Sequence, residues 1–304
     1  MDIGIFYGAA GTLLSGDDLV ADVTQAQVAG FSSYWIPQMP WGPDALTSLA
    51  IAGREVPDIE LGTGVVPTWP RHPLAMAQQA LTTASLIGDG RLSLGIGLAH
   101  KPVVEGQWGI PFDKPIRHAR EYLSILAPAL RNEKTSFEGE TLTGRAPALM
   151  KGVEAPRLYV AALGPQMLKL AGRMADGTVL WMTGLETLRT HTVPVIGQAA
   201  EEADRPKPRI LAGVPVLCTD DVAAGRAFAA QQFKVYGQLP SYRAMLDREG
   251  LAGPEDFAVI GTEDEIATRL QEFADNGVDT IMAVEFGPTE DDYARTRACL
   301  TNLV

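Results

Sequence analysis

The feature that most restricts the fold of this chain is a short pattern that occurs four times. A helical stretch ends near a glycine, and an apolar run follows within one or two residues. Glycine is suited to the left-handed residue that closes a helix, and runs that are apolar at successive positions are typical of parallel strands buried on both faces. The pattern therefore predicts helices that alternate with parallel strands. It occurs in VAGFSSYWIP, GDGRLSLGIG, MADGTVLWM and ADNGVDTIMAVEF, at Gly30, Gly90, Gly177 and Gly277.

Four further apolar runs bring the number of expected strands to about eight. The stretches that precede the strands show helical periodicity, as Leu19, Val23 and Ala26 do on one face. Eight strands that are mostly followed by helices predict an α/β fold of the (β/α)8 type, the TIM barrel. The additional strand runs are Ile3–Gly8, Ile59–Val66, Arg157–Leu163 and Ile210–Cys218.

Two stretches, residues 133–154 and 237–257, interrupt the alternation of helices and strands. The first falls between the fourth helix and the fifth strand, and the second falls before the last repeat, so insertions are expected after the fourth and seventh helices. Insertions where strands lead into helices usually build the wall or lid of an active site. Because no low-complexity linker or shift in composition divides the chain, residues 1–304 are expected to form a single domain.

A doubly wound Rossmann sheet is the main structural alternative to the barrel. Its G-x-G-x-x-G fingerprint should follow the first strand, but FYGAAGTLLSG does not contain it. The stretch LGIGLAH supplies only G-x-G, with His100 where the third glycine belongs. The barrel is therefore the preferred prediction.

The charge balance limits the classes of partner. Lys and Arg together number 25 and Asp and Glu number 37, which gives a formal net charge of −12. This balance argues against nucleic acid or an anionic membrane as the main partner and favours a small-molecule substrate. No apolar run is long enough to span a bilayer. Cys218 and Cys299 are too few for a disulfide framework, which favours a reducing cytoplasm.

The carboxyl ends of the expected strands, where barrel enzymes carry their chemistry, are mostly apolar, aromatic or small. The chain has no G-x-S-x-G and no H-E-x-x-H motif, and its four histidines are too far apart in the sequence to signal a metal site. Such a rim suits a bound planar cofactor that carries hydride chemistry better than it suits nucleophilic catalysis. No metal site is predicted.

Two positions on this rim are candidates for specific roles. His100 is expected at the end of the fourth strand, where it is either a catalytic group or a structural histidine. Gly164 and Pro165 are expected where the fifth strand leads into a helix, so free backbone N–H groups there could hold a phosphate. An ordinary turn that opens a helix is an equally good interpretation of Gly164 and Pro165. His118, between Arg117 and Arg120, is expected on a solvated helix face.

Nearly the whole chain resembles the luciferase-like monooxygenase superfamily, and within it the branch that uses the deazaflavin coenzyme F420. The resemblance rests on three stretches, of which the first is the most specific. They are LGTGVVPTWPRHPLAMAQQALTTASLIGDGRLSLGIG, AALGPQMLKLAGRMADG and VIGTEDEIATRLQEFADNGVDTIMAVEFG. None of the three separates an F420 enzyme from an FMN enzyme.

The resemblance implies a specific backbone feature and a set of cofactor-binding residues. Members of the family carry a non-prolyl cis peptide in the third strand, which by position is Gly64–Val65, in a bulge that presses against the flavin-like ring. The resemblance also places a phosphate cradle at the turn formed by Ala162, Gly164 and Pro165. The residues that it places around the ring are Thr63, Gly64, Val65 and Thr68.

The resemblance further implies hydride transfer between F420 and a small organic substrate, with a homodimer as the common assembly. Related sugar-phosphate dehydrogenases carry an Asp-His pair where this chain has Gln38 and Met39, and an acidic residue where it has His100. A reductase that uses His100 as proton donor is therefore expected rather than a sugar-phosphate dehydrogenase. Two alternatives stay open: an FMN-dependent monooxygenase that uses dioxygen and a partner flavin reductase, and a non-catalytic cofactor-binding protein.

Overall fold

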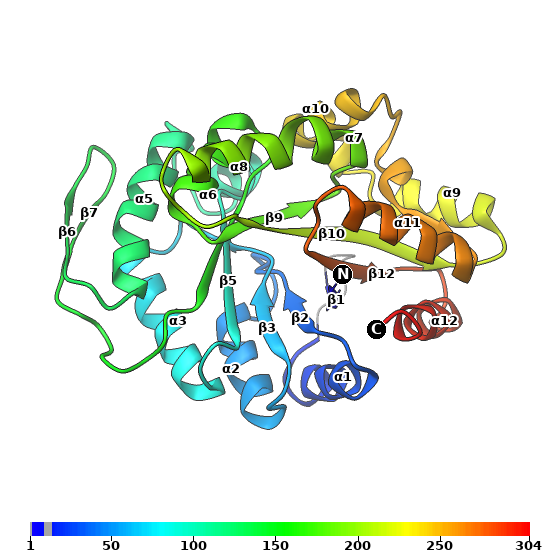
Figure 1. Cartoon of the computed structure of the whole chain (residues 1–304), viewed down its shortest axis with the longest axis horizontal. Helices are drawn as coiled ribbons and strands as arrows, with labels where there is room; N and C mark the ends of the chain where they lie inside the picture. Colours follow the sequence, from blue (N-terminus) through cyan, green and yellow to red (C-terminus); the bar gives the residue numbers. More distant parts are fainter. Residues whose placement is uncertain (1, 9–13) are drawn as a thin grey trace.

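The structure, a computed structural model, describes residues 2–8 and 14–304. Eight parallel strands close into a barrel, and helices surround it (Figure 1). The ring closes because β1 pairs with both β2 and β12. The predicted α/β fold and (β/α)8 barrel are confirmed. The barrel strands are β1 (Asp2–Phe6), β2 (Ser33–Ile36), β3 (Glu60–Thr63), β5 (Leu92–Gly97), β8 (Arg157–Ala161), β9 (Gly177–Trp181), β10 (Arg209–Cys218) and β12 (Thr280–Glu285).

The helices mostly follow the strands in the order that the sequence predicts. Two of them, α7 and α8, are joined by a π-helical turn over Leu188–Thr192. The helices are α1 (Gly16–Ala29), α2 (Ala45–Glu55), α3 (Pro73–Ile87), α4 (Lys101–Gly106), α5 (Pro115–Leu130), α6 (Pro165–Met174), α7 (Leu185–Thr187), α8 (Val193–Glu201), α9 (Val222–Gln232), α10 (Pro240–Glu249), α11 (Glu263–Asp275) and α12 (Glu290–Thr301).

The glycines of the repeated pattern do not all serve one purpose. Gly30 closes α1 in the left-handed region with φ of 94°, and Gly277 follows α11 with φ of 91°, as predicted. The expectation for Gly177 was wrong, because this residue is the first of β9 and does not close a helix. A Cβ on Gly177 would lie 2.0 Å from the carbonyl oxygen of Arg209 on the next strand. Close approach of two strands therefore explains this glycine.

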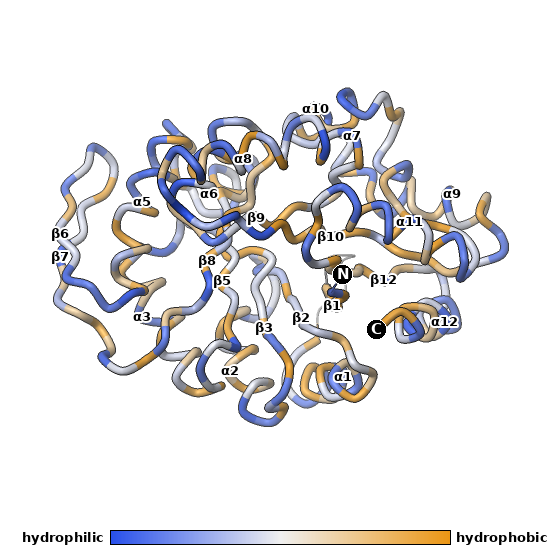
Figure 2. Tube along the Cα trace, in the orientation of Figure 1, coloured by the Kyte–Doolittle hydropathy of each residue, from blue (hydrophilic) through white to orange (hydrophobic). Residues whose placement is uncertain are grey.

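The apolar core has an outer layer between strands and helices and an inner layer inside the barrel. In β5, for example, Leu92, Leu94 and Ile96 belong to the outer layer. Orange segments run along the strands in Figure 2, whereas the tube of the outermost elements is more often blue. The inner layer contains Phe6, Trp35, Tyr159, Val179, Leu211, Met282 and Val284.

The first excursion forms a hairpin, β6 (Thr135–Glu138) and β7 (Thr143–Ala146), beside α5 (Figure 1). Its turn is held by Glu121 of α5, whose buried carboxylate accepts the N–H groups of Glu140, Thr141 and Leu142 at 2.7–3.0 Å. Burial opposes the ionisation of Glu121, but the hydrogen bonds from Thr141 and Leu142 outweigh it and lower the pKa of this carboxyl group. One buried carboxylate therefore attaches the hairpin to the barrel.

The second excursion lies between α9 and α11, on the connection from the seventh to the eighth barrel strand. It contains two short 3₁₀ helices, Tyr236–Gln238 and Pro254–Phe257, on either side of α10. A short strand, β11 (Val259–Gly261), then pairs with the end of β10. Tyr236 and Tyr242 of this excursion lie against Trp181, the last residue of β9, and against His100 beyond β5, so the excursion is on the side where the catalytic groups of barrels lie.

An ion-pair network joins the first and last repeats outside the seam between β1 and β12. Arg297 of α12 contacts both carboxylate oxygens of Glu285, one of them at 2.7 Å, and reaches Asp22 of α1 at 3.2 Å. Asp22 in turn accepts the hydroxyl of Tyr34. The side chain of Glu285 is only 6% exposed, and burial raises the pKa of its carboxyl group although Arg297 lowers it.

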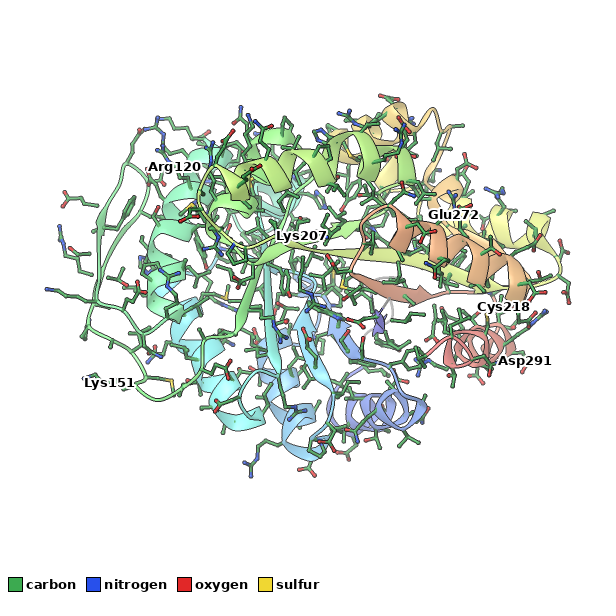
Figure 3. The ribbon with its side chains drawn as sticks, viewed as in Figure 1. Arg120, Lys151, Lys207, Cys218, Glu272 and Asp291 are labelled. Carbon is green, nitrogen blue, oxygen red and sulfur yellow. The ribbon has the colours of Figure 1, made fainter. Side chains whose placement is uncertain are left out.

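The outside of the described chain carries many charged side chains. Charged side chains lie on the outer side of helices and connections, as Arg120, Lys151 and Asp291 do in Figure 3. Within the described ranges, no helix has the length and apolar character that crossing a membrane requires. Cys218 and Cys299 are free and buried.

Candidate active site

The inside of the barrel is a packed core, so a site can form only above it, at the carboxyl ends of the strands. The inner layer fills the barrel, and Val65 and Trp181 lie against this layer as partly buried residues. The ring of Phe6 packs edge-on against Trp181 with centroids 6.1 Å apart. These side chains form an apolar floor for anything bound at the mouth.

The third strand carries a one-residue bulge where the resemblance places it. Gly62 pairs with Ser93 and Val66 pairs with Ile96, so residues 63–65 oppose only residues 94 and 95 of β5. The Gly64–Val65 peptide bond is cis, as the resemblance implies. The strand resumes beyond it as β4 (Val66–Pro67), which again pairs with β5.

Thr63 bridges the gap that the bulge opens in the ladder. Its hydroxyl accepts the N–H of Gly95 at 2.9 Å and donates to the carbonyl oxygen of Gly95 at 2.8 Å, and the residue is fully buried. A side chain thus satisfies two backbone groups that a regular strand would pair with its own backbone. The hydroxyl of Thr63 is therefore engaged in hydrogen bonds to Gly95, and the predicted contact of Thr63 with a cofactor stays a prediction.

Gly64 leaves no room for a side chain. A Cβ at this position would lie 2.7 Å from Cζ of Phe6, closer than carbon atoms approach without movement. Gly64 and Val65 are both half-buried. They are therefore the part of the bulge with surface left for a ligand.

Thr68 is engaged on the outer side of the barrel. Its N–H donates to the carbonyl of Gly97 at 3.0 Å, and its hydroxyl lies 3.0 Å from Nε2 of His118 on α5. The neighbouring Trp69 stacks on His118, with ring centroids 3.9 Å apart and planes 5° apart. α5 therefore holds the connection that follows the bulge, and the predicted contact of Thr68 with a cofactor stays a prediction.

The expectation that His118 is solvated was wrong, because its side chain is only 4% exposed. Burial lowers the pKa of His118 to about 4, although Glu121 raises it. The imidazole is neutral at pH 7. The flanking Arg117 and Arg120 suggested an exposed helix face. His118 and Tyr122 lie one helical turn apart, however, and this spacing could have indicated that both belong to the buried face of the helix.

His100 lies at the mouth of the barrel as predicted, three residues beyond the end of β5 and at the start of α4. Its ring centroid is 5.9 Å from that of Tyr242 in the second excursion. Burial lowers the pKa of His100, so the imidazole is neutral at pH 7 and able to accept a proton there. Its position agrees with a catalytic role without testing it.

The second excursion adds an aromatic wall that sequence analysis did not identify residue by residue. Tyr236 lies 5.7 Å from Trp181 of β9 and 5.1 Å from Tyr242, measured between ring centroids. Only the prediction that this excursion would line the site pointed to these tyrosines. The wall continues toward His100 through Tyr242.

Glu249, the last residue of α10, fastens the excursion to the connection after β9. Its carboxylate accepts the N–H groups of Glu186 and Thr187, at 3.2 and 2.5 Å. It also lies over Gly184, where a Cβ would be 2.3 Å from the carboxylate carbon. Nearby in the sequence, Thr183 is buried and its hydroxyl has no hydrogen-bond partner in the described part of the chain.

The turn Ala162–Pro165 has an open backbone, as a phosphate cradle requires. Gly164 is the N-cap of α6 and is exposed, and a Cβ there would meet no described atom within 4 Å. Ala162 is buried, and the turn is fixed by His191, whose Nε2 lies 3.0 Å from the carbonyl oxygen of Leu163. The first N–H groups of α6 have no acceptor within the helix and are free for an anion.

The predicted residues lie on the ends of three successive barrel strands. The bulge is on the third strand, His100 follows the fourth, and Ala162, Gly164 and Pro165 follow the fifth. Side chains of the third and fifth strands come close together over Gly97 of β5, the fourth strand. A Cβ on Gly97 would lie within 3.2 Å of both Val65, after the third strand, and Ala161, at the end of the fifth. The structure therefore brings the predicted residues to one side of the mouth, except Thr68, whose hydroxyl faces α5.

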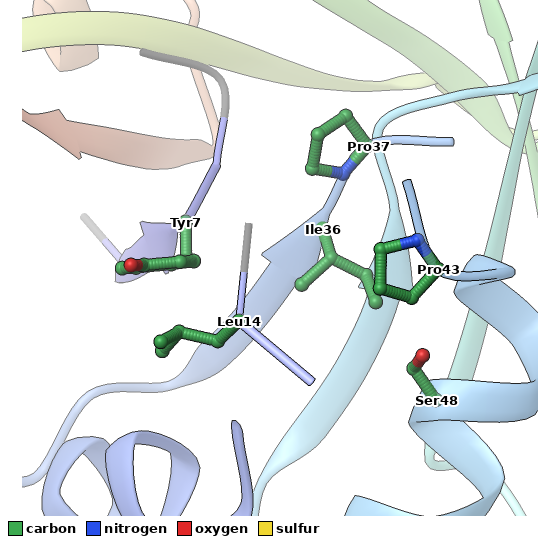
Figure 4. A pocket seen from close by; sticks show the side chains of 6 residues that line it. All are labelled: Tyr7, Leu14, Ile36, Pro37, Pro43 and Ser48. Carbon is green, nitrogen blue, oxygen red and sulfur yellow. The ribbon is translucent and has the colours of Figure 1, made fainter. Parts of the chain in front are cut away.

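Small cavities lie beside this region. One of about 10 Å³, room for a single water molecule, lies at the ends of β1 and β2 (Figure 4). It is lined by Tyr7, Leu14, Ile36, Pro37, Pro43 and Ser48. A second of the same size lies behind β5, against α5 and α6. Within residues 2–8 and 14–304, no group of three or more His, Cys, Asp or Glu side chains is arranged to hold a metal ion.

Comparison with known proteins agrees with this geometry. The 5,10-methylenetetrahydromethanopterin reductase of Methanolobus tindarius is 26% identical over 295 residues, which cover 88% of this chain and 90% of that protein. The coenzyme F420 dependent tetrahydromethanopterin reductase of Methanopyrus kandleri has a similar fold, with a TM-score of 0.81 at 20% identity over 100% of this chain and 98% of that chain.

An FMN complex has nearly the same fold. It is the oxygenating constituent of 3,6-diketocamphane monooxygenase of Pseudomonas putida, with a TM-score of 0.77 at 19% identity over 99% of this chain and 96% of that chain. The family model described as luciferase-like monooxygenase matches residues 1–280. The chain therefore belongs to the luciferase-like monooxygenase family, a family of oxidoreductases.

Proposed function

We propose that this protein transfers a hydride between coenzyme F420 and a small, apolar organic substrate, acting as a reductase. The observation that carries the proposal is the bulge of the third strand, which offers Gly64 and Val65 beside a rim with few ionisable groups. The named F420 dependence of the Methanopyrus kandleri protein and the named reductase activity of the Methanolobus tindarius relative support it.

The residues at the mouth fit such a cofactor. Val65 offers apolar surface to a planar ring, and the buried Thr183 hydroxyl lacks a partner among the described residues, as expected of a group that bonds to a ligand. The open N–H groups that follow Gly164 suit a phosphate. When bound in its reduced form, F420 would supply the hydride. Val65, Thr183 and the start of α6 would hold and orient it.

His100 is the group that we assign to proton transfer. It is an ionisable side chain just beyond the end of the fourth strand, and its ring lies beside Tyr242 of the aromatic wall. Because burial lowers its pKa, His100 must first take up a proton before it can donate one. Reduction that depends on His100 should therefore become faster as the pH falls toward its lowered pKa.

Titration of the purified protein with F420 and, separately, with FMN tests the proposal. The fluorescence of each cofactor reports binding, and we expect F420 to bind more tightly. Reduced F420 should then be oxidised in single-turnover experiments by some member of a panel of enones, imines and nitro compounds. Tight binding of FMN together with no binding of F420 would contradict the proposal.

An FMN-dependent monooxygenase is the second candidate. The similarity of fold to the FMN-bound camphane monooxygenase component favours it. It would require dioxygen and reduced FMN from a partner reductase. Oxygen consumption by the protein when reduced FMN is supplied, above the rate of FMN alone, would support this candidate against the first.

A further inference from the structure

Two glycines of β5 form a notch in the inner wall of the barrel. Leu92, Leu94 and Ile96 of this strand face the outer layer. Since side chains alternate along a strand, Gly95 and Gly97 face the interior. The notch is therefore a place in the wall, between these two positions, where inward side chains are missing.

The side chain of Val65 lies in this notch. A Cβ built on Gly97 would be 2.6 Å from Cγ2 of Val65, and one built on Gly95 would be 3.1 Å from Cγ1. The two methyl groups of Val65 thus occupy the space that side chains at 95 and 97 would fill. The G-x-G spacing of LGIGLAH serves this contact and not a dinucleotide fingerprint.

The two glycines differ in what else they touch. A Cβ on Gly95 would lie 2.0 Å from the backbone oxygen of Thr63, so Gly95 is required by the close approach of two backbones. The three atoms nearest to a Cβ on Gly97 would all belong to side chains: Cγ2 of Val65, Cβ of Ala161 at 3.2 Å and Cβ of Val65 at 3.8 Å. Gly97 is therefore the residue whose missing side chain affects Val65 without blocking the strand pairing.

We propose that Gly97 is a positioning residue for the cofactor: by having no side chain it lets Val65 lie low in the notch, and so sets the depth of the slot, the space above the exposed side of Val65 in which the cofactor ring would rest. The inference depends on the proposed function, because it assigns the ring to the exposed side of Val65. It extends that function to a residue of the neighbouring strand.

The expected displacement follows from the distance. Carbon atoms in contact lie about 3.5–4.0 Å apart, so a methyl group on residue 97 must move the Val65 methyl by about 1 Å from its place at 2.6 Å. The inner layer below, with Trp35 and Tyr159, is closely packed. We therefore expect Val65 to move upward, away from this layer and into the slot.

Five variants test the inference by fluorescence titration with F420 and FMN: Gly97→Ala, Val65→Ala, Gly95→Ala, and the two double variants that combine Val65→Ala with Gly97→Ala or with Gly95→Ala. We expect Gly97→Ala to weaken binding of the preferred cofactor by about tenfold or more. In the Val65→Ala/Gly97→Ala double variant the smaller side chain at 65 frees the space, so its affinity should return to that of Val65→Ala. Gly95→Ala should not be rescued by Val65→Ala, because its collision is with backbone.

Unfolding of the cofactor-free proteins gives a second measurement. In a double-mutant cycle, Val65→Ala should offset part of the stability that Gly97→Ala removes, which gives a favourable interaction energy between the two substitutions. The interaction energy between Val65→Ala and Gly95→Ala should be smaller. If Gly97→Ala does not fold, Val65→Ile replaces it, because the added carbon finds no room in the notch and must enter the slot. It should weaken binding in the same way.

The outcomes separate the two proposals. Wild-type protein that binds neither cofactor would overturn the proposed function, and the positioning role with it. Wild-type binding that Gly97→Ala leaves unchanged would overturn the positioning role alone. Weakened binding that Val65→Ala does not restore would equally overturn it, because the loss would then arise through Ala161 or the backbone.

Discussion

Replacement of Thr63 by valine isolates what its hydroxyl does for the bulge. Valine has nearly the same shape, so the substitution removes the hydroxyl and leaves the packing. The N–H and the carbonyl of Gly95, which the hydroxyl now serves at 2.9 and 2.8 Å, would both be buried without a partner. Each such group costs about 1–3 kcal/mol, so Thr63→Val should lower the free energy of unfolding by about 2–6 kcal/mol.

Thr63→Ser is the matched control. It keeps the hydroxyl and loses one buried methyl group, which corresponds to about 1 kcal/mol. Urea unfolding of the wild type and both variants, followed by circular dichroism, measures the difference through the transition midpoints at unchanged slope. If the valine variant is as stable as the serine variant, the two hydrogen bonds do not hold the bulge and the reasoning is refuted.

Three further predictions concern ionisable groups. The pKa of Glu121 is lowered in the folded protein, so its contribution to stability is present above the ordinary carboxyl pKa and disappears as the pH falls through the lowered value. Thermal unfolding at a series of pH values should therefore show that acidification lowers the unfolding temperature of the wild type. The decrease should be smaller in Glu121→Gln. Arg297→Met leaves Glu285 buried without its partner and should reduce the unfolding free energy by about 3–5 kcal/mol. The same change at Arg295, whose side chain is 37% exposed and pairs with exposed carboxylates, should have a smaller effect; equal effects in urea unfolding would contradict this. His100→Ala should reduce turnover by about 10²–10⁴-fold with little change in cofactor affinity, and should abolish the rise in reduction rate toward acidic pH; turnover unaltered by the substitution would exclude His100 as the proton donor.

The barrel could be predicted because its signals are local and repeated. Each of the eight strands is an apolar run with a neighbouring glycine or helical pattern, and all eight lie in the ring. The bulge at Gly64–Val65 was located through the resemblance and is present in the structure. Neither prediction depends on knowing which distant residues meet.

The parts that could not be predicted depend on contacts between distant segments. Nothing in the neighbourhood of Glu121 shows that it will bind a turn twenty residues later. The stack of Trp69 on His118 joins a loop to a helix, and the two arginines beside His118 suggested solvent instead. Gly177 was assigned to a helix end because the approaching strand is not visible in its own stretch of sequence.

The seam of the barrel also has a consequence for how the chain reaches its native state. Asp2 pairs with Thr280, so this one ladder joins segments at almost the greatest separation that the polypeptide allows. Contacts of that kind form late in folding, since the chain entropy of closing a long loop must be lost before the contacts contribute any stabilising free energy. Until then β1 and β12 are bare sheet edges, available to other molecules during synthesis or refolding. The charged cluster of Arg297, Glu285 and Asp22 reinforces the seam where chain entropy opposes pairing.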